Sequence, residues 1–393
     1  MKFDQLQNTS SSDKNIHWRG IIALNAVSTL SQLGQYGVGF IVMPMWLASR
    51  HLEAVQLGIF GACEWLGMLI ALLITPKLLK QHSSKKVILL SIVLTSLGFI
   101  FAIYVTWPLW IISALLIGLG IGLRWIANET WLYRIAPKHI LGQIVGVHEA
   151  LIALGAIIPP ALVIVLSTVN NDILWLGVLF NLLAILPLFM IASEKPIEAP
   201  PSLGKTSFFK IDKMTTLGMQ LAGACGLVDG ALTSLFPVFG LGRHFSEMQI
   251  ALMLTVIGIG GLVLQYPLGW LSDRKGLMRA SLLAALIALL VTSIMAFVPM
   301  AYGLLIALTF IFGGMTASFL TLGIIAAAST ANDDHMADNM SKISISFTVC
   351  SIFGALLAGY ATSGLGSDAL LWIVLLVSGI LTGILIKNLQ VTT

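Results

Sequence analysis

Six ionisable side chains lie inside long apolar stretches of this sequence, where a charge is costly. They are Glu64, Arg124, Glu129, His148, Glu149 and Asp229. In a lipid bilayer each such group costs about 2.5 kcal/mol or more, which makes it a functional candidate. At helical rise, Glu129 lies about 7–8 Å beyond Arg124. The next stretch runs back in the opposite direction and carries His148 and Glu149 near its start, so we expect these four groups at similar depth.

A cation flanked by carboxylates can neutralise them and still leave one free to change its protonation state, which suits a proton relay. We expect Glu129 or Glu149 to carry the proton first, and Asp229 next. Arg124 or His148 would adjust the proton affinity of that carboxylate. The alternative for this cluster is a structural ion-pair network that holds two helices together.

Helical spacing separates the roles of neighbouring residues. Arg124 and Asn128 lie four residues apart and share a helix face, whereas Glu129 points away from Arg124. Glu129 is therefore the expected partner of the stretch that carries His148 and Glu149. Glu64, in an earlier apolar stretch, is either an outer protonation site or an acid that packs between helices, and the sequence does not rank the two.

Uncharged polar side chains mark a possible lining for a pathway. The first apolar stretch carries Asn25, Thr29, Gln32 and Tyr36 along one stripe at helical spacing. Hydrogen bonding between helices would also explain such a stripe, and packing would explain Trp125 beside Arg124. The candidates for contact with a substrate are Arg124, Asn128, Asn25, Gln32, Tyr36, Trp125 and Thr233.

The elements that must position these residues are membrane helices. The chain has 393 residues, of which 58% are hydrophobic and 10% charged, and its mean hydropathy is +0.96. A soluble protein of this size could not bury so much apolar surface. Runs of about 20 apolar residues or more can cross a bilayer, and their number predicts an all-α membrane protein with twelve spans. The runs lie near residues 19–47, 54–75, 87–106, 108–133, 140–167, 173–193, 213–240, 248–271, 279–299, 301–328, 342–362 and 369–386.

A polar stretch divides these spans into two sets of six. With the N-terminus inside, 18 of the 21 lysines and arginines fall on the cytoplasmic side, as the positive-inside rule requires. The net charge of +4 therefore indicates orientation and not nucleic-acid binding. Residues 1–17 are polar and predict no cleavable signal peptide. The expected order is a cytoplasmic tail (1–18), a six-helix bundle (19–193), a cytoplasmic linker (194–212), a second six-helix bundle (213–388) and a cytoplasmic tail (389–393).

The two halves of the sequence match at an offset of 193 residues. One register aligns an outer loop with the helices around it, which predicts an internal duplication. At this offset Tyr36 is the counterpart of Asp229. The two halves are therefore expected to share an arrangement of helices but not the same functional residues. The matched pairs are Pro44 with Pro237, Arg50 with Arg243, His51 with His244, Gln56 with Gln249, and Gly67 with Gly260.

A short charged segment joins two apolar spans and reads GWLSDRKGLMR from residue 269 to residue 279. Its glycine, leucine, aspartate, arginine and glycine stand as in the signature loop of the major facilitator superfamily, approximately G-x-L-x-D-R-x-G-x-R. The chain resembles that family over residues 19–388. The resemblance implies two six-helix repeats, transport by alternating access, and a central pathway lined by the first, fourth, seventh and tenth helices. It also implies a gating loop formed by Gly269, Asp273, Arg274, Gly276 and Arg279.

The glycines of this loop are expected to let helix ends approach and the chain reverse. The corresponding loop in the N-terminal half departs from the signature, because Lys80 and Ser83 replace its aspartate and second glycine.

The fifth span resembles the antiporter signature of the same family, G-x8-G-x3-G-P-x2-G-G. Gly146, Gly155 and Pro160 keep the spacing, whereas Pro159 replaces a glycine and Val163-Ile164 replace the closing pair. The glycines would allow close helix approach, and the prolines would bend the span. This pattern indicates antiport; an ordinary kinked helix is the alternative.

These features predict a secondary transporter of the bacterial inner membrane that moves a small organic molecule by proton-coupled antiport, as efflux. The alternative is a proton-coupled symporter that imports a small anionic metabolite clamped by Arg124. A receptor or scaffold with the same fold would bind a ligand without accumulating it.

Other classes of function are not expected. The sequence has neither an H-E-x-x-H motif nor a nucleophile elbow, which argues against an enzyme, and no G-x-x-x-x-G-K-[ST] loop, which argues against ATP drive. The polar run Asn332–Asp338 is expected to be a hydrated turn and not a metal site. The expected partners are the substrate, protons and lipid, with a monomeric chain and no metal, cofactor or nucleic acid.

Overall fold

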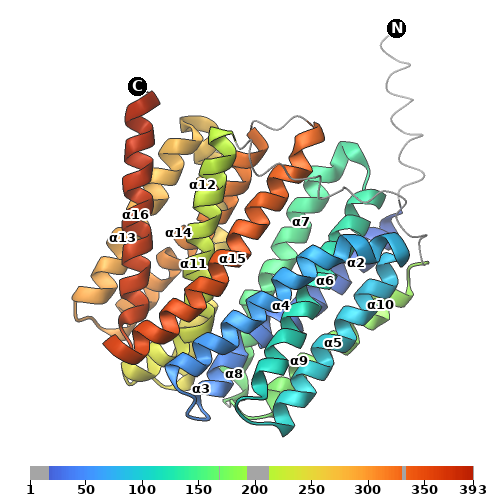
Figure 1. Ribbon diagram of the computed structural model, residues 1–393, viewed down its shortest axis with the longest axis horizontal. Coiled ribbons are helices and arrows are strands. Elements are labelled where there is room, and N and C mark those ends of the chain that lie inside the picture. Colours follow the sequence, from blue (N-terminus) through green and yellow to red (C-terminus); the bar gives the residue numbers. More distant parts are fainter. Residues whose placement is uncertain (1–16, 168, 193–211, 330–332, 393) are drawn as a thin grey trace.

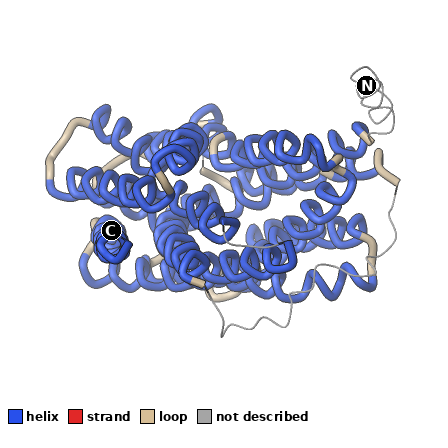
Figure 2. The backbone as a smooth tube through the Cα atoms, turned by 90° about the horizontal axis from the view of Figure 1, so that it is seen from above, coloured by secondary structure: helices blue, strands red, loops and turns tan. Residues whose placement is uncertain are grey.

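The computed structural model describes residues 17–167, 169–192, 212–329 and 333–392. In this part of the chain the structure consists of helices joined by loops, without a strand (Figures 1 and 2). The all-α fold predicted from the apolar runs is confirmed. The longer elements are α2 (Trp18–Gln32), η2 (Leu33–Val42), α4 (Ala54–Gln81), α5 (Ser84–Tyr104), α6 (Trp110–Ile135), α7 (Leu141–Ala153), α8 (Ile158–Leu166), α9 (Asp172–Leu183), α11 (Lys213–Gly242), α12 (Glu247–Lys275), α13 (Leu277–Phe297), α14 (Tyr302–Ser329), α15 (Asp333–Leu365) and α16 (Ala369–Thr392).

Eleven helices of the described chain are long and apolar enough to cross a membrane. The remaining predicted span, 19–47, is also helical, but the π-helix η2 separates α2 from the short helix α3 (Met43–Ala48). Glycines in η2 let other helices approach its backbone. A Cβ atom on Gly34 would lie 2.7 Å from the carbonyl oxygen of Gly177 in α9, and one on Gly37 would overlap Pro159 of α8. The wider π turn therefore lies where the first span is packed most closely by its neighbours.

The fifth span is broken, as its prolines predict. Helix α7 ends at Ala153, and the single 3-10 turn η4 (Leu154–Ala156) follows. Helix α8 then begins with Pro159 and Pro160 close to its start. Proline is tolerated there because the first turn of a helix has no carbonyl partner for its missing N–H group. The span is thus two helical segments joined by a tight turn.

The internal repeat is confirmed by matching backbone features 193 residues apart. After the first span of each half, His51 and His244 have positive φ angles of 62° and 61°. In each half a capping box then starts the second span, with Glu53 before α4 and Ser246 before α12. The two halves therefore share local geometry and not only a similar apolar pattern.

Matching arginines tie the ends of each half together. Arg50 donates to the side chain of Asn171, just before α9. Arg243 pairs with Asp368, just before α16, with Nε 2.9 Å from Oδ1. Each half therefore joins the end of its first span to the start of its sixth span.

The N-terminal and C-terminal sets of helices meet closely where α4 begins. A Cβ atom on Gly58 of α4 would lie 2.6 Å from the carbonyl oxygen of Ala355 and 2.8 Å from the Cα atom of Gly359, both in α15. At a second contact, a Cβ atom on Gly258 of α12 would lie 2.7 Å from the carbonyl oxygen of Ala156. Backbone packs directly against backbone at both places, which only glycine permits.

Several exposed side chains lie toward the end of the molecule at which α16 finishes (Figure 1). Along α7, which reaches this end, only Ile144 and His148 are buried, and Val147 is 57% exposed. Asp273 and Arg274 at the end of α12 are exposed as well. The close contact at Gly58 thus lies at the opposite end of the molecule from these exposed residues.

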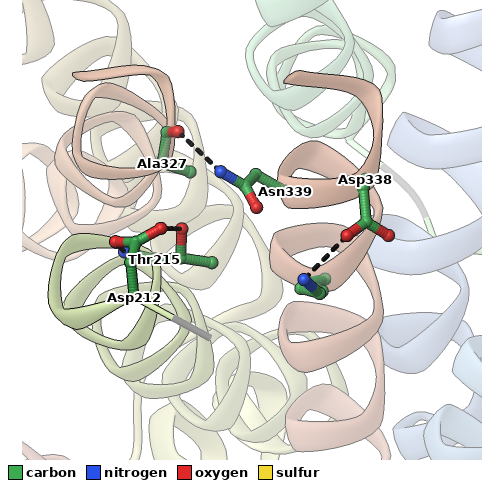
Figure 3. A network of polar contacts seen from close by, with 6 residues as sticks. Asp212, Thr215, Ala327, Asp338 and Asn339 are labelled. Atoms are coloured by element: carbon green, nitrogen blue, oxygen red, sulfur yellow. Dashed lines mark hydrogen bonds and ion pairs between the residues drawn. The ribbon is translucent and has the colours of Figure 1, made fainter. Parts of the chain in front are cut away.

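The predicted N-terminal tail and interdomain linker fall largely outside the described residues. The last linker residue, Asp212, is described and caps α11, because its carboxylate accepts hydrogen bonds from the Thr215 backbone N–H at 2.8 Å and the Thr215 hydroxyl at 2.7 Å (Figure 3). The boundaries proposed for the five regions stay predictions. At the other terminus, α16 continues to Thr392 through residues expected to form a tail.

The hydrated turn expected at Asn332–Asp338 is wrong for the residues that the structure describes. Asn332 lies outside them, and α15 already begins at Asp333. Two contacts explain the longer helix (Figure 3): Lys342 pairs with Asp338 one turn away at 2.8 Å, and the Asn339 side chain donates to the Ala327 carbonyl of α14 at 3.3 Å. Pairs four residues apart stabilise a helix end.

We predict that Gly58→Ala destabilises the protein by about 1–3 kcal/mol, because the added methyl group must displace the backbone of α15. Gly269→Ala is the matched control, since a Cβ atom there meets nothing within 4 Å. It should leave stability unchanged or raise it by up to about 1 kcal/mol, because alanine favours a helix more than glycine does. Thermal unfolding of the purified protein in detergent tests both. Equal melting temperatures for Gly58→Ala and wild type would contradict the proposed contact.

Candidate functional site

Arg124 is the centre of a polar network between the first and fourth spans. Its side chain is 3% exposed and lies on α6. Nε donates to Gln35 Oε1 at 2.7 Å, Nη1 donates to Ser28 Oγ at 3.1 Å, and Nη2 donates to Gln32 Oε1. A buried guanidinium needs such acceptors because water cannot reach it. We call Arg124 and these three side chains the Arg124 network.

The Arg124 network contains no direct ion pair. In the part of the chain that the structure describes, no carboxylate lies within 4.0 Å of the Arg124 guanidinium. Glu129 instead accepts a hydrogen bond from the indole Nε1 of Trp125, and its charge interacts with Glu149 and Arg124 from further away. The expectation that Glu129 points away from Arg124 is confirmed. A network of direct ion pairs, the alternative for this cluster, is not formed by these residues.

The fifth span is attached to the first through His148. Its Nδ1 lies 2.9 Å from Oδ1 of Asn25, and both side chains are buried. On α6, Asn128 donates to Ser28 Oγ at 2.8 Å, so Arg124 and Asn128 share a face as predicted. Four elements, α2, η2, α6 and α7, thus bring the predicted cluster together.

A cavity of about 220 Å³, which we call the central cavity, lies between the two sets of helices. Its walls come from η2, η4, α7, α11, α12 and α14 and include Tyr36, Ala156, Asp229, Ile257, Gln265 and Thr316. Among the described residues that line it, Asp229 is the only one with a charged side chain. The central cavity is therefore an apolar chamber with one carboxylate.

Tyr36 and Asp229 face each other in this cavity across the two halves. The Tyr36 hydroxyl lies 3.5 Å from Asp229 Oδ1, a long contact. The two residues are 193 positions apart, which is the offset of the internal repeat, so a position and its own repeat counterpart meet. Thr233, one turn after Asp229, donates its hydroxyl to the Asp229 carbonyl at 2.8 Å and lines a smaller adjacent pocket of about 60 Å³.

Glu64 is separate from both groups. Its side chain is 1% exposed on α4, and its Oε1 atom has no hydrogen-bond partner within the described chain. Neighbouring Trp65 packs its ring edge-on against Phe347 of α15, with centroids 5.5 Å apart. Glu64 therefore lies near the contact between the two sets of helices, without a partner for its carboxyl group.

The signature segment is mostly helical. Gly269, Asp273 and Arg274 belong to α12, and the Arg274 guanidinium lies 4.5 Å from the centroid of the Trp270 ring. The reversal occurs at Gly276, whose φ of 91° favours glycine. Arg279 is exposed in the first turn of α13.

Two of the glycine predictions are wrong. A Cβ atom on Gly269 or Gly146 would meet nothing within 4 Å, so neither residue permits a close helix approach. Gly155 does so, because its Cβ atom would lie 2.6 Å from Cγ of Gln32. The spacing of glycines in the sequence could not distinguish Gly155 from Gly146 and Gly269, because the atoms that would meet a Cβ atom belong to another helix.

Sequence reasoning missed some of the polar lining. Gln265 of α12 lines the central cavity and accepts a hydrogen bond from the Thr321 hydroxyl at 2.8 Å. Thr95 of α5 receives a hydrogen bond from Gln35 Nε2 at 3.2 Å and so supports the Arg124 network. Both are polar residues inside apolar runs, and this is the sequence signal that marks them.

We predict that Arg124→Lys destabilises the protein by about 1–3 kcal/mol, because one ammonium group cannot replace the three directed hydrogen bonds of the guanidinium. Arg274→Lys is the control, since that arginine is exposed and should be replaceable at little cost. Thermal unfolding in detergent compares the two. If the melting temperature falls no more for Arg124→Lys than for Arg274→Lys, the Arg124 network does not stabilise the protein as proposed.

Comparison with known proteins agrees with this architecture. The model of the Major Facilitator Superfamily matches residues 24–301 and 221–390. The MFS-type transporter YcaD of Escherichia fergusonii is 23% identical over 359 residues, which cover 90% of this chain and 91% of the relative.

Solved structures show the same fold. A variant of the nucleoside transporter NupG superposes with a TM-score of 0.77 at 13% identity, over 94% of this chain and 99% of the other. A D-xylose-proton symporter superposes with a TM-score of 0.72 at 12% identity, over 93% and 97%. Because the family model matches nearly the whole sequence, this chain belongs to the Major Facilitator Superfamily of membrane transporters.

Proposed function

We propose that this transporter exports a small organic molecule from a bacterial cytoplasm in exchange for protons. The observation that carries the proposal is the central cavity, which lies between the two sets of helices and holds the Asp229 carboxylate. A buried ionisable group at the centre of a transporter can exchange protonation for substrate. On this proposal the proton gradient supplies the energy, and the protein works as a monomer without a cofactor.

Alternating access would act through the two six-helix bundles, 19–193 and 213–388. With both termini placed in the cytoplasm, as the distribution of lysine and arginine predicts, the contact at Gly58 and Gly359 is extracytoplasmic. The described conformation would then be closed on the outside. Transport requires the bundles to separate at the glycine contacts and to close at the opposite end.

The Arg124 network links the protonation state of Glu129 to the central cavity. Glu129 and Glu149 would lie in the cytoplasmic half, and the long-range interaction of Glu129 with Arg124 changes when Glu129 gains or loses a proton. Arg124 holds Gln32 and Gln35, which flank the turn that presents Tyr36 to Asp229. Protonation of Glu129 would remove its negative charge and so weaken its attraction for Arg124. Because Arg124 holds the segment that carries Tyr36, this change would reach one wall of the central cavity.

The alternative of anion import receives less support. A substrate anion would have to approach Arg124, but Arg124 is not among the residues that line the central cavity. Its Nε, Nη1 and Nη2 atoms already donate to side chains of the first span. An anion in the cavity would also face the Asp229 carboxylate, which repels it.

Everted membrane vesicles, loaded with a trapped pH-sensitive dye and acidified inside by respiration, test the proposal. We predict that adding a transported compound releases protons from the vesicle interior and that Glu129→Gln abolishes this release, because the amide cannot relay the proton between Asp229 and the cytoplasm. Accumulation of the compound should be lost in parallel.

The control is Glu247→Gln at the start of α12, which lies outside the proposed coupling groups and should behave as wild type. Undiminished proton release by a correctly inserted Glu129→Gln variant would refute the assignment of Glu129. Accumulation of small carboxylates driven by inward proton movement would favour the symport alternative.

A further inference from the structure

We propose, building on the antiport function, that the central cavity binds a small organic monocation whose charge is held by the Asp229 carboxylate beside Tyr36. In this proposal the substrate and the transported proton compete for one carboxylate. Four features of the cavity carry the inference: the sign of its charge, the weak coordination of that charge, the apolar character of the walls, and the size.

The carboxylate of Asp229 lacks a counter-ion. In the described chain, no lysine, arginine or histidine lies within 4.0 Å of it. Its Oδ1 atom has the 3.5 Å contact with the Tyr36 hydroxyl, and the side chain is only half-buried because it faces the cavity. A carboxylate held away from bulk water without a cation is costly, so either a proton or an external cation must complete this site.

The walls fit an organic cation better than a metal ion. Val228, Leu232 and Ile257 supply apolar surface around the carboxylate. The Tyr36 ring adds aromatic surface to the lining and stacks on Phe40 with centroids 5.7 Å apart. Aromatic faces attract organic cations, and apolar walls hold their hydrocarbon part.

A metal ion in this cavity would have to share side-chain oxygen atoms with existing hydrogen bonds. The Gln265 side-chain oxygen accepts a hydrogen bond from Thr321, and the Thr316 hydroxyl donates to the carbonyl of Phe312 at 2.9 Å. Hard cations such as calcium or magnesium require about six oxygen ligands. Among the described lining residues only Asp229 is charged, and its single negative charge matches a monocation and leaves a divalent ion half neutralised.

The size of the cavity limits the ligand. Its volume of about 220 Å³ is smaller than the roughly 300–1,000 Å³ that holds drug-sized molecules. A single-ring amine or a compact quaternary ammonium ion is therefore the matching class.

Exchange at Asp229 balances in charge and in atoms. When the carboxyl group is protonated, an arriving ammonium ion takes the place of the proton, the O–H bond breaks, and the proton leaves to water. One positive charge enters and one leaves, so the cavity keeps its net charge. The titratable side chains that line the cavity with Asp229 are Tyr36 from η2 and Cys225 from α11 itself, while α12 and α14 contribute none.

Three probes of nearly equal shape test the proposal with the purified full-length protein: benzylammonium, benzyl alcohol and benzoate. They place a positive, a neutral or a negative group on the same ring. In calorimetric titration at mildly alkaline pH, we predict that benzylammonium binds at least about tenfold more tightly than either of the others. Its affinity should fall on acidification, because protons then occupy Asp229. In weakly buffered, mildly acidic solution its binding should release a proton, whereas benzyl alcohol should release none.

Asp229→Asn should remove the preference for benzylammonium over the neutral and negative probes. Tyr36→Phe should weaken the binding of benzylammonium but keep that preference. Glu247→Gln is the control with an acid removed far from the cavity. The measurements on wild type decide the matter if Asp229→Asn fails to fold. Equal binding of benzylammonium and benzyl alcohol, binding without proton release or pH dependence, or no binding of benzylammonium at millimolar concentration would each overturn the proposal.

The outcome is separable from the test of antiport. Selective binding of benzylammonium without coupled proton release in vesicles would keep the cation site and overturn the antiport function. Coupled export of neutral compounds alone, with no preference for benzylammonium in the binding test, would keep antiport and overturn the cation site.

Discussion

The apolar interior of a membrane cannot solvate a charge, and much of the N-terminal half depends on how this constraint is met at Arg124. Three side chains of the first span accept hydrogen bonds from its guanidinium, so the first and fourth spans cannot slide past each other without leaving a buried charge unsatisfied. The glycines of η2 bring other helices close to the same segment. The position of Tyr36 in the central cavity follows from these contacts, which makes the network structural support for the site.

The internal duplication explains why the central cavity has one charge and not two. Two repeats related by an approximate two-fold axis bring equivalent positions together at that axis. Tyr36 and Asp229, 193 residues apart, meet there at 3.5 Å. Two carboxylates at this distance would repel each other, and two tyrosines would provide no charge. Divergence of the repeats at this single pair therefore creates a donor facing an acceptor, whereas the outer arginines at Arg50 and Arg243 could stay alike because each acts within its own half.

Helical periodicity predicted correctly which side chains share a face of one helix. It failed for features that depend on a neighbouring helix. The shared face of Arg124 and Asn128, the opposite direction of Glu129 and the break at Pro159 could all be derived from the sequence, because each depends on local geometry. The role of Gly269 was predicted wrongly, because the sequence does not show which backbone lies nearby. The π-helix η2 was not predicted either. A regular α-helix already places Ser28, Gln32 and Gln35 on one face, so their contacts with Arg124 do not reveal the wider turn.

The proposed site at Asp229 supplies a physical rule for exchange. Closing the two bundles over the central cavity removes it from water, which is costly while Asp229 carries an uncompensated charge. A bound proton or a bound cation removes that penalty, so both loaded forms can close and the empty, ionised form cannot. The glycine contacts at Gly58 and Gly258 involve backbone and few interlocking side chains, so they can break and re-form without extensive repacking. A carrier that closes only when loaded with one of two competing cations must exchange them, and obligatory antiport then follows from the electrostatics of a single carboxylate.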